Sequence, residues 1–170
     1  MTAWSVLIVE DDPTVRERLS RAIEHHPNLT LLTAVGSCAE ARTVFTITPP
    51  QVMLVDIGLP DGDGVELIRE ITSLQDTVDV MVITVFGDEK HVLAALKAGA
   101  AGYLLKDSSL ADIGEAVMQL IQGGSPISPP IVRYLLKHFR QSERITKPEV
   151  DIPILTSRER EVLNLIVKGF

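Results

Sequence analysis

Five short apolar segments recur along the chain, and each is followed by polar residues and then by a segment whose apolar residues have helical spacing. The apolar segments are Ser5–Val9, Leu29–Val35, Val52–Val55, Val80–Ile83 and Tyr103–Leu105. An unbroken apolar run such as Val52–Val55 is typical of a strand that is covered on both faces. The alternation of the five segments with helices predicts an α/β fold with a doubly wound parallel sheet, whose crossovers are right-handed.

The segments between these strands carry the start and stop signals of helices. Asp12 followed by Pro13 is typical of an N-cap and a first helical residue. Ser37 and Glu40 have the spacing of a capping box. We therefore expect helices from Asp12 to about residue 25, from Ser37 to about residue 45, over about residues 64–74, from Asp88 to Gly99, and from Ser109 to Gly123.

A joint rich in glycine, proline and serine follows at residues 123–130, and beyond it we expect a helix over about residues 131–140 and a polar linker over 141–151. Charge changes here as well. The first 132 residues carry 18 acidic and 8 basic side chains, whereas residues 133–170 carry 5 and 8. These shifts predict regions with different partners, divided as 1–124, 125–152 and 153–170.

Composition excludes several classes of protein. With 45% hydrophobic and 23% charged residues, the chain resembles ordinary globular domains, and no apolar run is long enough to span a bilayer. The amino terminus lacks the pattern of an export signal. Cys38 is the only cysteine, so no intramolecular disulfide can form. We therefore expect a cytoplasmic protein with no membrane partner.

Polar side chains stand where four of the expected strands end. Glu10 and Asp11 follow the first strand, Asp56 follows the third, Thr84 ends the fourth and Lys106 follows the fifth. In open parallel sheets, ligands bind at this carboxyl edge. Three neighbouring carboxylates repel one another unless a cation lies among them, and their oxygens suit Mg²⁺. A lysine and a hydroxyl beside them could bind the oxygens of a phosphoryl group.

Over about residues 4–122 the sequence resembles the receiver domain of two-component response regulators. Five motifs in the same order carry the resemblance: Leu7–Asp12, Val55–Pro60, Asp63–Gly64, Val82–Thr84 and Gly102–Lys106. The resemblance implies a flavodoxin-like (βα)5 sheet with strand order 2-1-3-4-5 in a bacterial signalling protein.

For the acidic residues, the resemblance implies a phosphorylation site that depends on Mg²⁺. Asp56 would be the phosphoacceptor, and its donor would be the phosphohistidine of a sensor kinase. Asp11 would bind Mg²⁺ directly and Glu10 through water, while the backbone carbonyl of Gly58 would complete the protein ligands.

For the other polar residues, the resemblance implies contacts to the phosphoryl group. Thr84 and Lys106 would bind its oxygens, and Tyr103 would report phosphorylation through a change of rotamer. Two positions depart from the family pattern. Val85 is larger than the residue usual after the threonine, which is expected to restrict access to the phosphoryl group. Asp107 replaces the proline common after the lysine.

Residues 154–170 resemble the opening of a LuxR-type helix-turn-helix domain. The run Leu155–Leu163 carries that resemblance, and with the joint Gly123–Pro129 it indicates the NarL/FixJ subfamily. Taken alone, the capping-box spacing of Thr156 and Glu159 and the apolar stripe after it fit equally an amphipathic helix that docks on the receiver or on a partner. The second, DNA-reading helix is absent, so we expect a truncated form that does not bind an operator specifically.

The resemblance implies a switch that a sensor histidine kinase phosphorylates, that dimerises on phosphorylation, and that controls transcription in its full-length form. One alternative is a receiver that acts through protein contacts without binding DNA. Another is a Mg²⁺-dependent phosphatase of the haloacid-dehalogenase type. Those enzymes need a second aspartate two residues after the nucleophile, where this chain has Gly58. We therefore expect no enzyme activity beyond the chain's own phosphorylation and dephosphorylation.

Overall fold

The computed structural model describes residues 3–107 and 109–145. Five parallel strands form one sheet, in the order β2-β1-β3-β4-β5. The strands are β1 (Trp4–Val9), β2 (Leu29–Val35), β3 (Val52–Val55), β4 (Asp79–Thr84) and β5 (Gly102–Leu105). This arrangement confirms the flavodoxin-like fold and the strand order that the sequence predicts.

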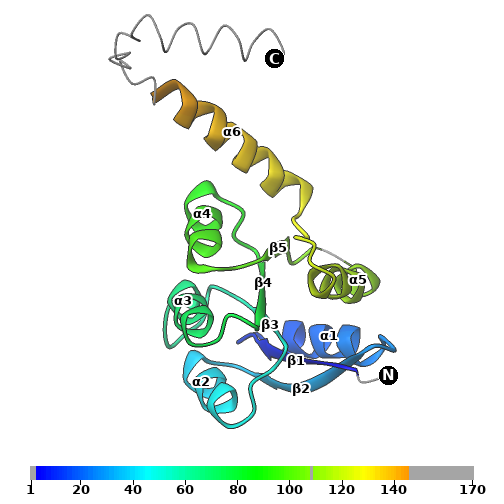
Figure 1. The fold of residues 1–170 in the computed structure, drawn as a ribbon. Helices are drawn as coiled ribbons and strands as arrows, with labels where there is room; N and C mark the ends of the chain where they lie inside the picture. Colours follow the sequence, from blue (N-terminus) through cyan, green and yellow to red (C-terminus); the bar gives the residue numbers. More distant parts are fainter. Residues whose placement is uncertain (1–2, 108, 146–170) are drawn as a thin grey trace, which may run out of the picture. The chain divides into compact units, whose positions relative to one another are not determined.

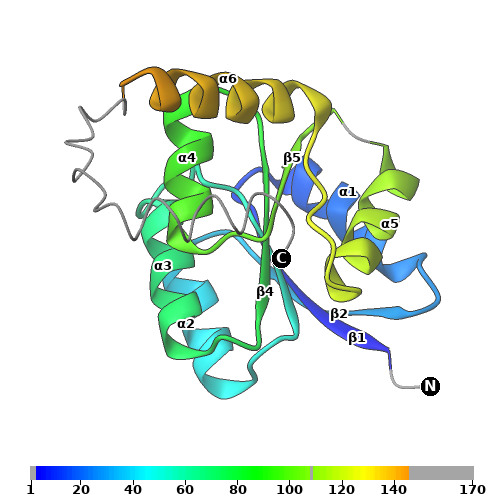
Figure 2. The ribbon, with the colours of Figure 1, turned by 45° about the horizontal axis from the view of Figure 1, so that its top comes forward.

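Helices cover both faces of the sheet (Figures 1 and 2). The covering helices are α1 (Pro13–Glu24), α2 (Cys38–Ile47), α3 (Gly64–Leu74), α4 (Glu89–Ala98) and α5 (Leu110–Ile121), and a further helix, α6 (Pro129–Ile145), follows them in the chain. Residues of α1 and α5 share one hydrophobic core with the sheet, and residues of α2, α3 and α4 share the other. Within the described residues, none of these helices is long and apolar enough to cross a membrane.

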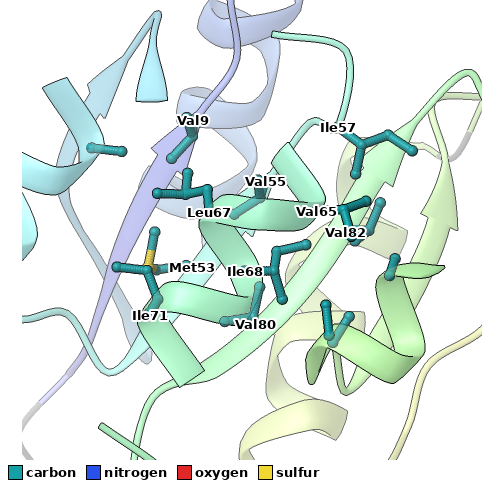
Figure 3. Packing of buried hydrophobic residues seen from close by; sticks show 14 of the residues in the cluster. Val9, Met53, Val55, Ile57, Val65, Leu67, Ile68, Ile71, Val80 and Val82 are labelled. Atoms are coloured by element: carbon teal, nitrogen blue, oxygen red, sulfur yellow. The ribbon is translucent and has the colours of Figure 1, made fainter. Parts of the chain in front are cut away.

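Alternate residues of the central strands point into the two cores, as the period of a strand requires. Met53 and Val55 belong to the core beneath α2, α3 and α4, whereas Val52 and Leu54 belong to the core beneath α1 and α5. All four side chains are buried, which explains why the third apolar run has no polar face. Figure 3 shows the helix residues that pack against the first of these cores, Leu67, Ile68 and Ile71 of α3.

The capping box expected at α2 forms only in part. The Ser37 hydroxyl accepts a hydrogen bond from the Glu40 backbone N–H, as predicted. The Glu40 carboxylate, however, accepts from the Gly36 N–H rather than from the Ser37 N–H. The first two N–H groups of the helix donate instead to the carboxylate of Asp61, at 2.8 and 2.9 Å. A residue from the loop after β3 therefore completes the cap.

The chain segment between α5 and α6 runs beside the outer edge of β5. The Tyr103 N–H donates to the Pro126 carbonyl, and the Ser128 N–H donates to the Tyr103 carbonyl. The Leu105 N–H donates to the Ser128 hydroxyl. Ile131, in the first turn of α6, is fully buried in the core beneath α2, α3 and α4. The start of α6 is therefore fixed to the edge and the core of the sheet.

Helix α6 is longer than the sequence predicts. It spans Pro129–Ile145 rather than about 131–140, so the first part of the expected polar linker is helical. Residues 1–136 and 137–170 form two compact units. The division of the chain at residues 124 and 152 stays a prediction, and the expected helix-turn-helix segment, 153–170, lies outside the described residues.

Replacing Ile131 with alanine tests how α6 is anchored. Because the side chain is fully buried, Ile131→Ala should lower the free energy of unfolding by about 2–4 kcal/mol. Leu136→Ala, on the same helix but at a side chain 51% exposed, should lower it far less. Urea denaturation of both variants measures the difference, and equal losses would contradict the buried position of Ile131.

Candidate functional site

The sheet's hydrogen bonds continue one residue beyond three of the strands. The Glu10 N–H donates to the Val35 carbonyl at 2.9 Å, and the Asp56 N–H donates to the Val9 carbonyl at 2.9 Å. The Lys106 N–H donates to a carbonyl at the end of β4, that of Thr84, at 3.0 Å. The backbone therefore fixes three charged side chains at the carboxyl edge of the sheet.

Lys106 joins two carboxylates at this edge. Its Nζ lies 2.6 Å from Asp56 Oδ2 and 2.8 Å from Glu10 Oε2. The Gly58 backbone N–H donates to the other Asp56 oxygen, Oδ1, at 3.1 Å. Only 14% of the Lys106 side chain and 6% of the Asp56 side chain are exposed. These groups form a compact, largely buried ion cluster from three different strand ends.

Burial sets the protonation behaviour of this cluster. Desolvation raises the pKa of Glu10, and hydrogen bonding to Lys106 only partly offsets that rise. Burial lowers the pKa of Lys106, but its bonds to Asp56 and Glu10 outweigh burial and hold the pKa above its ordinary value. The native state binds the Glu10 proton more tightly than the unfolded chain does. The contribution of this proton to the free energy of unfolding is therefore lost as pH rises through the native pKa of Glu10.

The same edge offers a set of oxygen ligands. One carboxylate oxygen from each of Glu10, Asp11 and Asp56 lies within 4.8 Å of the other two. Asp11 is exposed, whereas the other two side chains are buried, so a bound ion could keep water ligands on its open side. Hard oxygens that leave room for water fit Mg²⁺. The role of the Gly58 carbonyl as a further ligand stays a prediction.

Two of the predicted residues, Thr84 and Tyr103, meet at the backbone of Phe86. Thr84 is fully buried at the end of β4, and its hydroxyl accepts a hydrogen bond from the Phe86 N–H at 3.3 Å. Tyr103 is fully buried in β5, and its hydroxyl donates to the Phe86 carbonyl at 2.6 Å. Burial raises the pKa of Tyr103, so this phenol remains a hydrogen-bond donor. A single loop residue therefore contacts both side chains.

The side chain of Phe86, rather than that of Val85, packs beside the acidic site. The Val85 side chain is 68% exposed. The Phe86 ring lies so close to Gly58 that a Cβ atom there would be 2.9 Å from ring atom Cε2. The Phe86 ring also stacks on the ring of His91, at a centroid distance of 5.0 Å. Restricted access at Val85 stays a prediction, and the ring nearest to the site belongs to the next residue.

The sequence did not point to two arginines of α1 that hold the loops of the site. Arg16 Nη1 donates to the carbonyls of Glu10 and Asp11, at 2.7 and 3.2 Å. Arg18 Nη2 donates to the carbonyl of Lys106 at 2.7 Å. No spacing rule connects residues 18 and 106. The available signal was the scarcity of basic residues in residues 1–132: three of the eight, Arg16, Arg18 and Arg21, lie on this one helix.

Residues 6–118 match the family model of the response regulator receiver domain. The chain is similar to the transcriptional regulatory protein DegU of Brevibacillus brevis, with 32% identity over 97% of this chain and 75% of DegU. It is 28% identical to the nitrate/nitrite response regulator protein NarL of Escherichia coli (strain K12), over 97% of this chain and 76% of NarL. A solved LuxR-family two-component response regulator from Aurantimonas sp. SI85-9A1 superposes with a TM-score of 0.76, at 27% identity, over 82% of this chain and 99% of that one.

Gly64 provides a test of how tightly the loop after β3 is packed. A Cβ atom at Gly64 would lie 2.6 Å from the Asp56 carbonyl oxygen and from the Ile57 Cα. Helix propensity alone favours alanine in α3 by about 1 kcal/mol. The contact with backbone reverses this sign, and Gly64→Ala should lower the free energy of unfolding by about 1–3 kcal/mol.

The matched control lies two residues earlier, in the loop that precedes α3. A Cβ atom at Gly62 would make only an ordinary contact, 3.4 Å from Cys38 Sγ, so Gly62→Ala should leave stability nearly unchanged. Thermal and urea unfolding measure both variants. A more stable Gly64→Ala protein would show that the loop does not approach α3 as closely as the structure indicates.

Proposed function

The chain belongs to the response regulator receiver family, as the receiver of a LuxR-type regulator, and we propose that a sensor histidine kinase phosphorylates it on Asp56. The observation that carries this proposal is the ion cluster at the carboxyl edge of the sheet. Lys106 Nζ lies within 2.8 Å of carboxylate oxygens of both Asp56 and Glu10, which are 46 residues apart in the sequence. Burying these charges costs desolvation free energy. Their burial is therefore better explained by a functional requirement than by a gain in stability.

In the proposed reaction, an Asp56 carboxylate oxygen attacks the phosphorus atom of the donor phosphohistidine. The new P–O bond forms as the P–N bond breaks, and the imidazole leaves with the electron pair and takes up a proton. The Gly58 N–H and the Lys106 ammonium orient the two Asp56 oxygens before the attack. When Mg²⁺ is bound by Asp11, Asp56 and the Gly58 carbonyl, with Glu10 acting through water, it supplies positive charge for the phosphoryl oxygens.

Lys106 and Thr84 then bind the transferred group. The ammonium of Lys106 turns from the carboxylates to a phosphoryl oxygen, and the Thr84 hydroxyl donates a hydrogen bond to another. In dephosphorylation, water attacks the phosphorus atom and the P–O bond to Asp56 breaks, which releases inorganic phosphate and restores the carboxylate. The chain acts on no separate substrate in this proposal, and it catalyses only its own phosphorylation and dephosphorylation.

The contacts of Phe86 offer a route by which phosphorylation could change the surface of the receiver. When the Thr84 hydroxyl turns to the phosphoryl group, it no longer accepts a hydrogen bond from the Phe86 N–H. Tyr103, whose hydroxyl donates to the same residue, changes its rotamer in response. This shifts the population towards a homodimer. In the full-length protein, with residues 1–124 as receiver and 125–152 as linker, that dimer binds DNA through the domain that begins at residue 153.

Asparagine at position 56 tests the assignment of the phosphoacceptor. Asp56→Asn should abolish labelling by acetyl phosphate in the presence of Mg²⁺, because the amide is not a nucleophile at this site. The control is Asp61→Asn, in the same loop, where the carboxylate caps α2. Intact mass measurement detects the added phosphoryl group, and labelling of the Asp56→Asn protein equal to wild type would reject the assignment.

Thermal unfolding tests the metal site separately. An ion that binds only the native state stabilises it by about 2.7 kcal/mol at a hundred times its dissociation constant. Mg²⁺ should therefore raise the unfolding temperature, and a chelator should reverse the rise. Asp11→Asn should lose most of this effect, whereas Asp76→Asn, in the loop between α3 and β4 that precedes the amino end of β4, should keep it. A wild-type protein whose unfolding temperature ignores Mg²⁺ would contradict the site.

A further inference from the structure

Lys106 is held through its backbone as well as through its side chain. Its N–H donates to the Thr84 carbonyl at 3.0 Å. Its carbonyl accepts a hydrogen bond from Arg18 Nη2 at 2.7 Å. Its ammonium contacts Asp56 and Glu10. Arg18 is thus the contact that fixes the carbonyl end of this residue, from a helix 88 residues away in the sequence.

Phosphoryl transfer, as proposed above, changes the side-chain part of this arrangement. The ammonium leaves Glu10 for a phosphoryl oxygen. The hydrogen bonds of the Lys106 backbone must then fix the position from which its side chain extends. The next residue, Asp107, has no proline ring to restrict the backbone. Arg18 supplies a charge-assisted hydrogen bond at this point, which is short and directional.

The position of Arg18 is not explained by stability alone. Its Nε is buried and has no hydrogen-bond partner among residues 3–107 and 109–145. A buried donor without a partner is unfavourable. Arg16, by comparison, donates to the carbonyls of Glu10 and Asp11. Helix α1 therefore holds both sides of the site, the acidic loop through Arg16 and the lysine through Arg18.

We propose that Arg18 is a positioning residue for phosphoryl transfer to Asp56, which it promotes by fixing the backbone of Lys106. The inference rests on the proposed function of Asp56. In this proposal Arg18 contacts neither the phosphoryl group nor the metal. Loss of the Arg18 side chain should therefore slow phosphoryl transfer without weakening the binding of Mg²⁺ by the acidic residues.

The test uses the whole 170-residue chain with Arg18→Met, which keeps an unbranched side chain but removes the donor and the charge. At saturating Mg²⁺, the rate constant for phosphorylation by acetyl phosphate should fall about tenfold, which is less than the roughly hundredfold cost of a full 1 Å misplacement, because Arg18 acts only through the backbone of Lys106. The Mg²⁺ dissociation constant from calorimetry should stay unchanged. Arg18→Lys, which can still donate to the Lys106 carbonyl, should recover part of the rate.

Arg21→Met is the matched control, because Arg21 lies on the same helix with an exposed side chain that pairs with Glu17. It should label at the wild-type rate. An unchanged rate in Arg18→Met would overturn the proposal, as would equal losses of rate and of Mg²⁺ affinity, which indicate a generally loosened site. A wild-type chain that is not labelled at all would instead overturn the proposed function, and this inference with it.

Discussion

Gathering like charges at one edge of a sheet is the constraint on which the rest of this structure depends. Oxygens of Glu10, Asp11 and Asp56 lie within 4.8 Å of one another, and the Lys106 ammonium contacts two of these carboxylates, those of Glu10 and Asp56. In water these groups would stay apart and hydrated. They meet because three parallel strands end at the same level, and because two hydrophobic cores hold those strands in register. The cores therefore supply the stability that the charged edge lacks.

The sequence predicted the parts of the fold that depend on local patterns. Short, largely apolar segments located the five strands, and the polar residues that follow them located the carboxyl edge with Asp56 and Lys106. The end of α6 was placed too early, because a polar composition is compatible with an exposed helix as well as with a linker. The cap of α2 was predicted only in part, because its second partner, Asp61, comes from a distant loop.

Arg16 and Arg18 of α1 show which parts of the site local sequence patterns do not predict. Candidate acidic and phosphoryl-binding residues follow strand ends, so topology alone brings them together. Arg16 and Arg18 act from a helix, through backbone carbonyls that carry no sequence signature. Phe86 is similar, because its contacts with Thr84 and Tyr103 run through its own backbone. Residues that hold a site through the main chain become visible only in three dimensions.

The segment that runs beside β5 also affects how such sheets meet other chains. An unpaired outer strand presents a row of backbone donors and acceptors on which a foreign strand can add. Here residues 126–128 already form hydrogen bonds with the backbone of β5. A strand from another chain could therefore pair with β5 only by first displacing these residues and the start of α6. Within the described residues the opposite border of the sheet is β2, which pairs only with β1. A strand from another chain can thus add to the sheet only at β2, the edge opposite to the one where Lys106 and the linker are anchored.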